Sequence, residues 1–303
     1  MSKLLKSLIP ASLKRILKNK LKKRQQTRIY RLPPVNWVGL PLATLEIVRR
    51  TKQSPALIEV PLSKCRGLRA MAFPCGSDSF HPFITALRYK DNEILRDYFK
   101  LVQPSSVGEL FEIYRKTPVA VMPALNYVYP WDGDPSDDIY QYRKKFISKE
   151  NKSHGGSGNY EGWHHFGPVS ENKVALEFQR LEHIYGNIKE NGYVRSDKPD
   201  GDIAGILLFR DNDYCAVISK GHHRIAALAA LGVDEIPLRI GVNRRSYVDR
   251  ADFMKWPGVV SSAFLPEEAL KIFDRIFEGR QPAFCEAWKD YCGNRRKLAV
   301  DGD

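Results

Sequence analysis

The chain has 303 residues, 43% of them hydrophobic, which is enough for a substantial core in one large domain or two ordinary ones. Its five cysteines (65, 75, 215, 285 and 292) contain no CxxC pair, which argues against a disulfide scaffold or a cysteine-rich zinc module and favours a cytoplasmic setting. The formal charge of +13 is uneven, because residues 1–28 hold ten Lys or Arg and no acid. The rest of the chain is nearly balanced, which makes nucleic acid an unexpected partner.

Residues 1–28 carry leucines and isoleucines at helical spacing, with lysines between them and a break at Pro10. We expect neither a membrane span nor a secretory signal here, because no apolar run is long enough. A basic amphipathic segment can lie on an anionic membrane surface, with its leucines at the acyl boundary. We therefore predict peripheral membrane association; docking on the protein's own body, a solvated arm or another partner are the alternatives.

The middle of the chain combines one expected strand with helical patterns and a polar stretch. A proline-punctuated connection precedes the apolar run at 56–62, which predicts a strand. Helical patterns extend from 91 to about 130. The stretch 132–170 is polar and contains several glycines, so we predict a long loop or insertion there.

From residue 171 the patterns are clearer. Apolar residues on one face predict a helix that stops at Asn191-Gly192. The apolar runs 205–210 and 214–219 flank Asp211-Asn212-Asp213 and predict a hairpin. Three further elements are expected: a helix opening at 222 and ending at Gly232, a strand at 235–240, and one strong C-terminal helix between Pro266 and Gly279.

The segment KGHHR, residues 220–224, stands between the hairpin and the following helix. A glycine allows a sharp turn, and the first N–H groups of a helix, with its dipole, form a site for anions. Arg224 can clamp a phosphate in a two-pronged manner, and histidines exchange protons near neutral pH. The alternative is that Ser219 or a neighbour caps the helix while the histidines are solvated.

The phrases LEHIYGNIKENGY, GHHRIAALAALG and EIPLRI, in this order across residues 171–240, resemble the ParB/sulfiredoxin-like superfamily. This resemblance implies an α+β fold: a mixed sheet with flanking helices, a large helical and loop insertion at about 91–170 within a domain spanning 29–245, and a helical C-terminal extension over 246–303. It also implies that the turn binds the phosphates of a nucleotide, ATP or another, with Mg²⁺.

Carried over residue by residue, the resemblance makes Gly221 the turn glycine, and His223 and Arg224 the pair that contacts phosphate. His222 stands where sulfiredoxin has its reactive cysteine, so sulfiredoxin chemistry is not implied. Lys220 replaces an aspartate found in many relatives, which removes a carboxylate and adds a cation that favours phosphate.

The box HPFITALRY, residues 81–89, is interpreted as a further motif of the superfamily, with Arg88 as an additional phosphate ligand. The alternative is that His81 and Arg88 are ordinary surface residues.

Other candidate sites lie outside the turn. His164 and His165 could bind a metal or contact substrate, but neighbours in an extended strand point to opposite sides, so we expect at most one of them in any site. The acidic run 132–138 could hold Mg²⁺, but its spacing is not that of an EF-hand and a solvated loop is favoured. Three glutamates on the predicted helix could face a site, and the sequence selects none of them: Glu177, Glu182 and Glu190.

These features favour an ATP-dependent phosphotransferase acting on a small-molecule or glycan-type substrate, with His222 or His165 (or His164) as the base. The tail would hold it at the inner membrane surface, where envelope polysaccharides are assembled. A ParB-like nucleotide switch or DNA-binding module is the alternative, but residues 241–303 do not read as a helix-turn-helix. A scaffold with a decayed site is the third hypothesis, because Lys220 replaces an acid.

Overall fold

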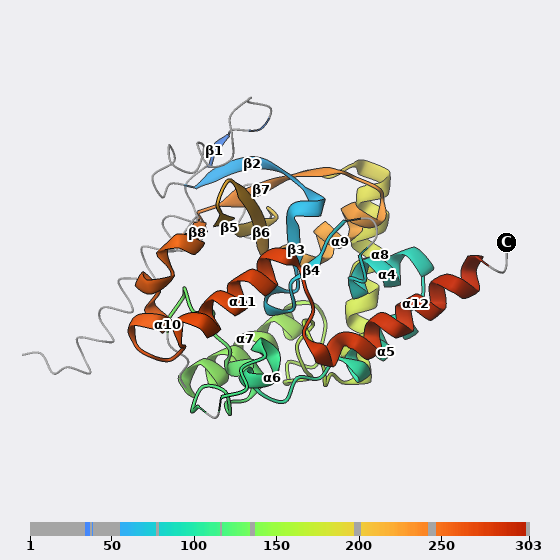
Figure 1. The fold of residues 1–303 in the computed structure, drawn as a ribbon. Coiled ribbons are helices and arrows are strands. Elements are labelled where there is room, and N and C mark those ends of the chain that lie inside the picture. The colour runs from blue at the N-terminus through green and yellow to red at the C-terminus, as the bar shows by residue number, and fades with distance from the viewer. Residues whose placement is uncertain are drawn as a thin grey trace, which may run out of the picture.

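In the computed structural model of the protein, the strand predicted at 56–62 and the predicted hairpin belong to one mixed sheet (Figure 1). The structure describes residues 34–36, 38, 55–76, 79–115, 117–133, 137–196, 201–241 and 247–300. The basic segment 1–28 lies outside these residues, and its membrane association stays a prediction. Within the described ranges, no helix has the length and apolar character needed to cross a membrane.

The sheet runs in the order β1-β2-β7-β5-β6-β3-β4, and β8 pairs with β5. Its strands are β1 (Val35–Asn36), β2 (Ala56–Pro61), β3 (Cys65–Gly67), β4 (Phe73–Pro74), β5 (Ala204–Arg210), β6 (Asp213–Lys220), β7 (Glu235–Ile240) and β8 (Tyr247–Asp249). The β2–β7 and β5–β6 pairs are antiparallel, whereas β3–β6 and β5–β7 are parallel. The central strand β5 is buried along nearly its whole length, as expected for an apolar run.

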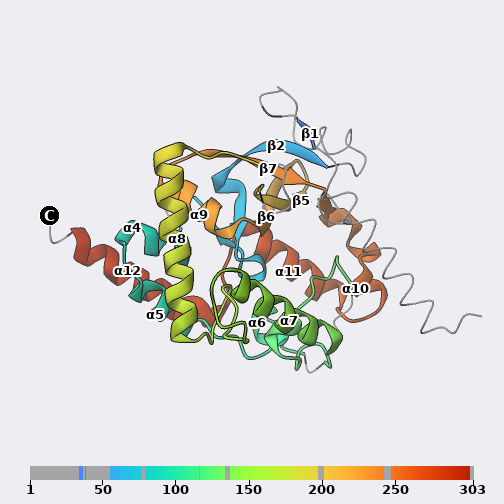
Figure 2. The same ribbon diagram turned by 180° about the vertical axis from the view of Figure 1, so that it is seen from behind.

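Helices surround this sheet. They are α4 (Pro82–Tyr89), α5 (Glu93–Leu101), α6 (Val107–Phe111), α7 (Asp137–Ser153), α8 (Glu171–Asn191), α9 (His222–Ala230), α10 (Pro257–Val260), α11 (Pro266–Glu278) and α12 (Glu286–Val300). Short 3-10 turns are η1 (Leu62–Lys64), η2 (Arg69–Met71), η3 (Ala124–Asn126), η4 (Arg250–Lys255) and η5 (Ala283–Cys285). Figure 1 shows α11 and α12 on one side, and Figure 2 shows α8 on the other, with α9 beside it. The protein is therefore an α+β protein with a mixed sheet.

The elements predicted between residues 171 and 279 are confirmed. Helix α8 begins after Ser170, whose hydroxyl accepts the N–H of Lys173, and ends at Gly192. The hairpin β5–β6 turns at residues 211–212, and α11 ends at Gly279 in the left-handed region. Each of these predictions rested on a local pattern of apolar residues with a capping or turn residue at its end.

Two sequence predictions are wrong. The stretch 132–170 is not all loop, because 137–153 form α7, and α11 is not the one long C-terminal helix, because α12 follows it. Helix α7 is polar, with exposed side chains on much of its surface. It contacts the rest of the protein through buried Ile147 and half-buried Arg143. Arg143 lies 4.3 Å from the Tyr127 ring centroid and donates to the carbonyl oxygens of Leu125 and Tyr127.

The 91–170 segment shares its hydrophobic core with the sheet. One continuous hydrophobic core includes Trp131, Ile147 and Trp163 from this segment together with the buried strands. Helix α9 packs against both α4 and α8, which brings its first turn next to the end of this segment.

Candidate functional site

The turn between β6 and α9 has the geometry that its glycine predicted. Gly221 has φ +84°, and a Cβ there would lie 3.1 Å from Ile203 Cα, so only glycine fits without strain. The first intrahelical hydrogen bond of α9 runs from Ile225 N–H to Gly221 O at 3.0 Å. The N–H groups of His222 and His223 therefore have no acceptor within the helix.

No side chain caps α9 at its N-terminal residue. Ser219, the capping residue of the alternative hypothesis, instead donates its hydroxyl to Ala204 O at 3.1 Å, across the hairpin. That alternative is wrong for Ser219, and its second part is wrong as well, because His222 and His223 are only 5% and 6% exposed.

His223 belongs to a buried ionic network. Its Nε2 lies 2.5 Å from Glu177 Oε2. The other oxygen of the carboxylate accepts from Lys173 Nζ at 2.5 Å and from Arg180 Nη1 at 2.9 Å. Lys173 and Glu177 are both 0% exposed, and Lys173 Nζ also donates to Asn151 Oδ1 at 2.5 Å. We define Lys173, Glu177, Arg180 and His223 as the α8 ion network.

Burial and the neighbouring charges both shift the pKa values of His223 and Glu177. Burial lowers the pKa of the His223 imidazole, although the neighbouring Glu177 carboxylate acts in the opposite direction. Burial opposes ionisation of Glu177, yet its contact with His223 and the charge of Arg180 hold the pKa of its carboxyl well below the usual range. The arrangement is thus an ionised carboxylate bonded to two cations and to one imidazole N–H.

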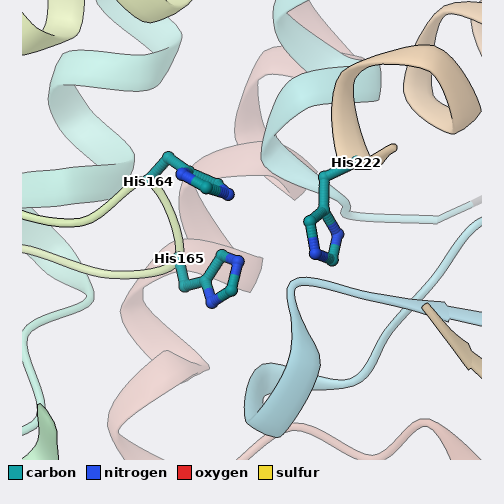
Figure 3. A group of neighbouring side chains, drawn as sticks. All are labelled: His164, His165 and His222. Carbon is teal, nitrogen blue, oxygen red and sulfur yellow. The ribbon is translucent and has the colours of Figure 1, made fainter. Parts of the chain in front are cut away.

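His222 is outside this network and faces two other histidines, His164 and His165 (Figure 3). Its Nδ1 accepts the N–H of Leu68 at 3.3 Å, whereas its buried Nε2 has no hydrogen-bond partner within the described residues. Its ring centroid lies 4.8 Å from that of His165 and 5.7 Å from that of His164. The structure therefore brings together His222 and His165, each of which the sequence analysis names as a candidate base.

The expectation that the side chains of His164 and His165 point to opposite sides is wrong. The two residues occupy a tight turn in which Phe166 N–H donates to Trp163 O at 3.3 Å, and Trp163 and Phe166 form a β-bridge. Side chains alternate between faces in extended strands but not at the tip of such a turn. Both imidazoles therefore approach His222, and the three nitrogens, one from each ring, lie within 4.8 Å of one another.

Burial shifts the pKa of all three histidines in the same direction. Burial lowers the pKa of His164, with His165 adding to the effect. Burial also lowers the pKa of His165 and of His222, and the charge of Arg69 acts in the same direction on both. All three values lie well below that of an ordinary histidine.

Arg69 is a site residue that the sequence analysis missed. Its Nη2 donates to Ser219 O at 2.9 Å, next to the β6–α9 turn. Leu68, Arg69 and Ala72 all have left-handed backbone, with φ of 52°, 51° and 55°. Such strained conformations in residues other than glycine concentrate at functional sites, where the surrounding structure holds them.

The three cations predicted to bind phosphate, Lys220, Arg224 and Arg88, differ in burial. Lys220 and Arg224 are half-buried at the turn, and Arg224 Nη1 donates to Gly201 O. Arg88 is exposed in the last turn of α4. The same box reaches the site through Phe83, whose ring lies 5.1 Å from that of His223.

His81 is not an ordinary surface residue. It is 0% exposed, its Nδ1 accepts the Phe83 N–H at 3.2 Å, and burial lowers the pKa of its imidazole to about 3. A Cβ at Gly67 would lie 2.5 Å from His81 Nε2, so that close approach requires glycine.

A cavity of about 740 Å³ lies elsewhere, between the β3–β4 region and the start of α12. None of the residues predicted to act in a site lines it; its walls include Phe73, Ser79, Arg280, Gln281 and Lys289. The acidic run at 132–138 is described only in part: Asp132 is exposed, and residues 137 and 138 begin α7.

The sequence contained a signal for the α8 ion network. Lys173 and Glu177 are spaced i, i+4 and share the helix face of Val174, Phe178 and Leu181, all of which are buried. A charged pair within an apolar face predicts a buried ion pair, and this criterion selects Glu177 over the exposed Glu182 and Glu190.

Comparison with known proteins leaves the site to be interpreted from its geometry. No protein-family model matches the chain, and neither a curated protein nor a solved structure matches it.

Proposed function

We propose that the protein binds the phosphates of a nucleotide at the start of α9, and that it is an ATP-dependent phosphotransferase of the ParB/sulfiredoxin-like kind. The observation that carries this proposal is the helix start itself. Gly221, in the left-handed region, connects β6 to α9 and has no side chain to cap the helix, and Lys220 and Arg224 are half-buried beside it. Backbone N–H groups, the helix dipole and cations together favour a phosphate.

The side chains of His222 and His223 take a different part from the one that the resemblance implies. His223 is bonded to Glu177, and His222 faces His164 and His165. Their contribution to phosphate binding is therefore their backbone N–H groups, while Arg224, Lys220 and Arg69 supply positive charge. We do not retain His222 and His165 as bases, because both are buried behind the helix start.

ATP with Mg²⁺ fits this site in part. Two buried carboxylates lie nearby, and both are engaged by cations. Glu177 is bonded to Lys173, Arg180 and His223. Asp202 is bonded to Arg195 and Arg239, so neither carboxylate readily offers its oxygens to a hard cation. Mg²⁺ would therefore be held mainly by the nucleotide's own phosphates. Phosphoryl transfer depends on positioning and charge stabilisation, which the turn and its cations can supply.

Thermal unfolding with ATP, ADP, CTP or GTP, each with Mg²⁺, tests the proposal. A ligand at 100 times its Kd stabilises the folded state by about 2.7 kcal/mol, so the unfolding temperature should rise with concentration. Arg224→Ala should abolish the rise. Arg115→Ala, an exposed arginine outside the turn, is the matched control and should retain it.

Absence of a response to every nucleotide would contradict the proposal and favour the scaffold hypothesis. Stabilisation without release of ADP in the presence of candidate glycan acceptors would favour the non-catalytic nucleotide switch.

We also propose that residues 1–28 hold the protein on an anionic membrane surface, where it would act on a glycan-type or other small-molecule substrate of envelope polysaccharide synthesis. The ten basic residues of this segment support the proposal, since each adds about 1 kcal/mol near an anionic surface. The full chain should sediment with anionic vesicles but not with neutral ones. Equal sedimentation after deletion of residues 1–28 would contradict it.

A further inference from the structure

His164, His165 and His222, which we call the histidine cluster, bring unpartnered ring nitrogens together in the protein interior (Figure 3). The three side chains are 6%, 2% and 5% exposed. His164 Nδ1, both nitrogens of His165 and His222 Nε2 are buried without a hydrogen-bond partner among the described residues. Buried polar atoms are nearly always satisfied, so this concentration in one place calls for a ligand.

We propose that the histidine cluster binds a divalent transition metal, Zn²⁺ in the first instance, through one ring nitrogen of each histidine. Three imidazoles without a carboxylate form a donor set for zinc, copper, nickel or iron, and not for Mg²⁺ or Ca²⁺. A single ion requires only that these ring nitrogens lie close together, and they lie within 4.8 Å of one another. The proposal goes beyond nucleotide binding and does not depend on it.

The protein positions the cluster before any metal arrives. The His165 ring lies 3.8 Å from the Trp163 ring, and Tyr98 Oη donates to His165 O at 2.6 Å. Glycine is needed on the far side of the turn, since a Cβ at Gly167 would lie 1.9 Å from Phe99 O. These contacts fix the backbone that carries two adjacent ligands, as a metal site requires.

Each histidine offers one ring nitrogen as a ligand, and these three atoms lie within 4.8 Å of one another. In tetrahedral zinc sites with Zn–N bonds of about 2.0 Å, the donors are about 3.3 Å apart. The nitrogens here lie within 4.8 Å, so loading would draw the rings together by up to about 1.5 Å.

Metal binding would also change the hydrogen bond that His222 Nδ1 makes. This atom now accepts the Leu68 N–H, so the neutral ring has its proton on Nε2, the atom that faces the cluster. Coordination through Nε2 moves the proton to Nδ1 and breaks the bond from Leu68. Metal binding is therefore coupled to the left-handed segment that begins at Leu68.

Arg69 and Arg143 act on His165 by charge from outside the cluster. Two guanidinium groups near a divalent ion are unfavourable unless an anion compensates them. Three protein ligands leave a tetrahedral ion with an open position. We expect that position to be filled by an anion such as hydroxide or a phosphate oxygen.

Metal uptake by the full chain tests the proposal. The metal-free protein should bind about one Zn²⁺ per chain, and Co²⁺ should give the intense visible bands of a tetrahedral site. His164→Gln, His165→Gln and His222→Gln should each weaken Zn²⁺ binding by about 100-fold or more. The double variant His154→Gln, His183→Gln removes two exposed histidines and should bind as the unaltered chain does.

The Leu68 amide provides a second measurement that does not require a substitution. Its hydrogen exchange should accelerate when Zn²⁺ is added to the unaltered chain, because its acceptor is lost. Failure of that chain to take up Zn²⁺ or Co²⁺, or uptake that the control variant abolishes, would overturn the proposal. A negative nucleotide experiment would leave the metal result unaffected, so the two proposals fail separately.

Discussion

The residues at the start of α9 fall into two groups, which differ in burial and in the groups that they contact. On one side, Lys220 and Arg224 are half-buried around Gly221. On the other, His222 and His223 are buried, one facing two further histidines and the other bonded to Glu177. The sequence analysis interpreted these five consecutive residues as one phosphate site, but their side chains lie in two different environments. Substitutions in the two environments should therefore have different consequences.

The largest effect is expected in the α8 ion network on the buried side. Glu177→Leu leaves Lys173 buried without its carboxylate and should lower the free energy of unfolding by about 3–5 kcal/mol. Urea denaturation measures this loss. Glu182→Ala, at an exposed position of the same helix, should change the free energy by less than about 0.5 kcal/mol.

Adding Lys173→Met to Glu177→Leu should restore part of that loss, because apolar residues of similar volume can replace a buried ion pair. A double variant as unstable as the sum of the single ones would show that the two charges do not interact. A cost below about 1 kcal/mol for Glu177→Leu alone would show that water reaches the network.

An intermediate effect is expected at the junction of the two sides. Gly221→Ala puts a Cβ on a residue at φ +84° and 3.1 Å from Ile203 Cα, and should cost about 1–3 kcal/mol. Gly186→Ala in α8 is the matched control, since a Cβ there meets nothing within 4 Å. It should stabilise the protein by about 0.5–1 kcal/mol. Equal effects at the two glycines would contradict the assigned turn geometry.

The smallest effect on stability is expected on the half-buried side. Lys220→Gln should alter the free energy of unfolding by less than about 0.5 kcal/mol, yet weaken nucleotide binding by about 3- to 10-fold through lost charge. Titrations at low and high salt separate the two contributions, because salt screens the lysine. A large loss of stability in this variant would place Lys220 with the buried side instead.

The sequence predicted best where a local pattern decided the structure. The hairpin, α8, the turn at Gly221 and β7 all appear where apolar spacing and turn residues put them. Helix α7 was missed because its few apolar residues give no clear periodicity, and its anchor, Arg143, rests on Tyr127 from a distant segment.

The site was predicted only in part, for the same reason. Both His164 and His165 approach His222 because the chain turns between Trp163 and Phe166. The sequence analysis did not predict that turn. Arg69 reaches Ser219 only because β3 and β6 are neighbours in the sheet, and no local pattern encodes that pairing.

The turn at Trp163–Phe166 also bears on how the protein could be divided or grafted. It belongs to the 91–170 segment, whereas His222 follows more than fifty residues later on α9. A fragment limited to the motif-bearing residues 171–240 would carry one histidine of the cluster and lack Trp163, Tyr98 and Arg69. What the sequence presents as an insertion therefore carries two of the three cluster histidines, and transplanting the recognisable motif alone would leave them behind.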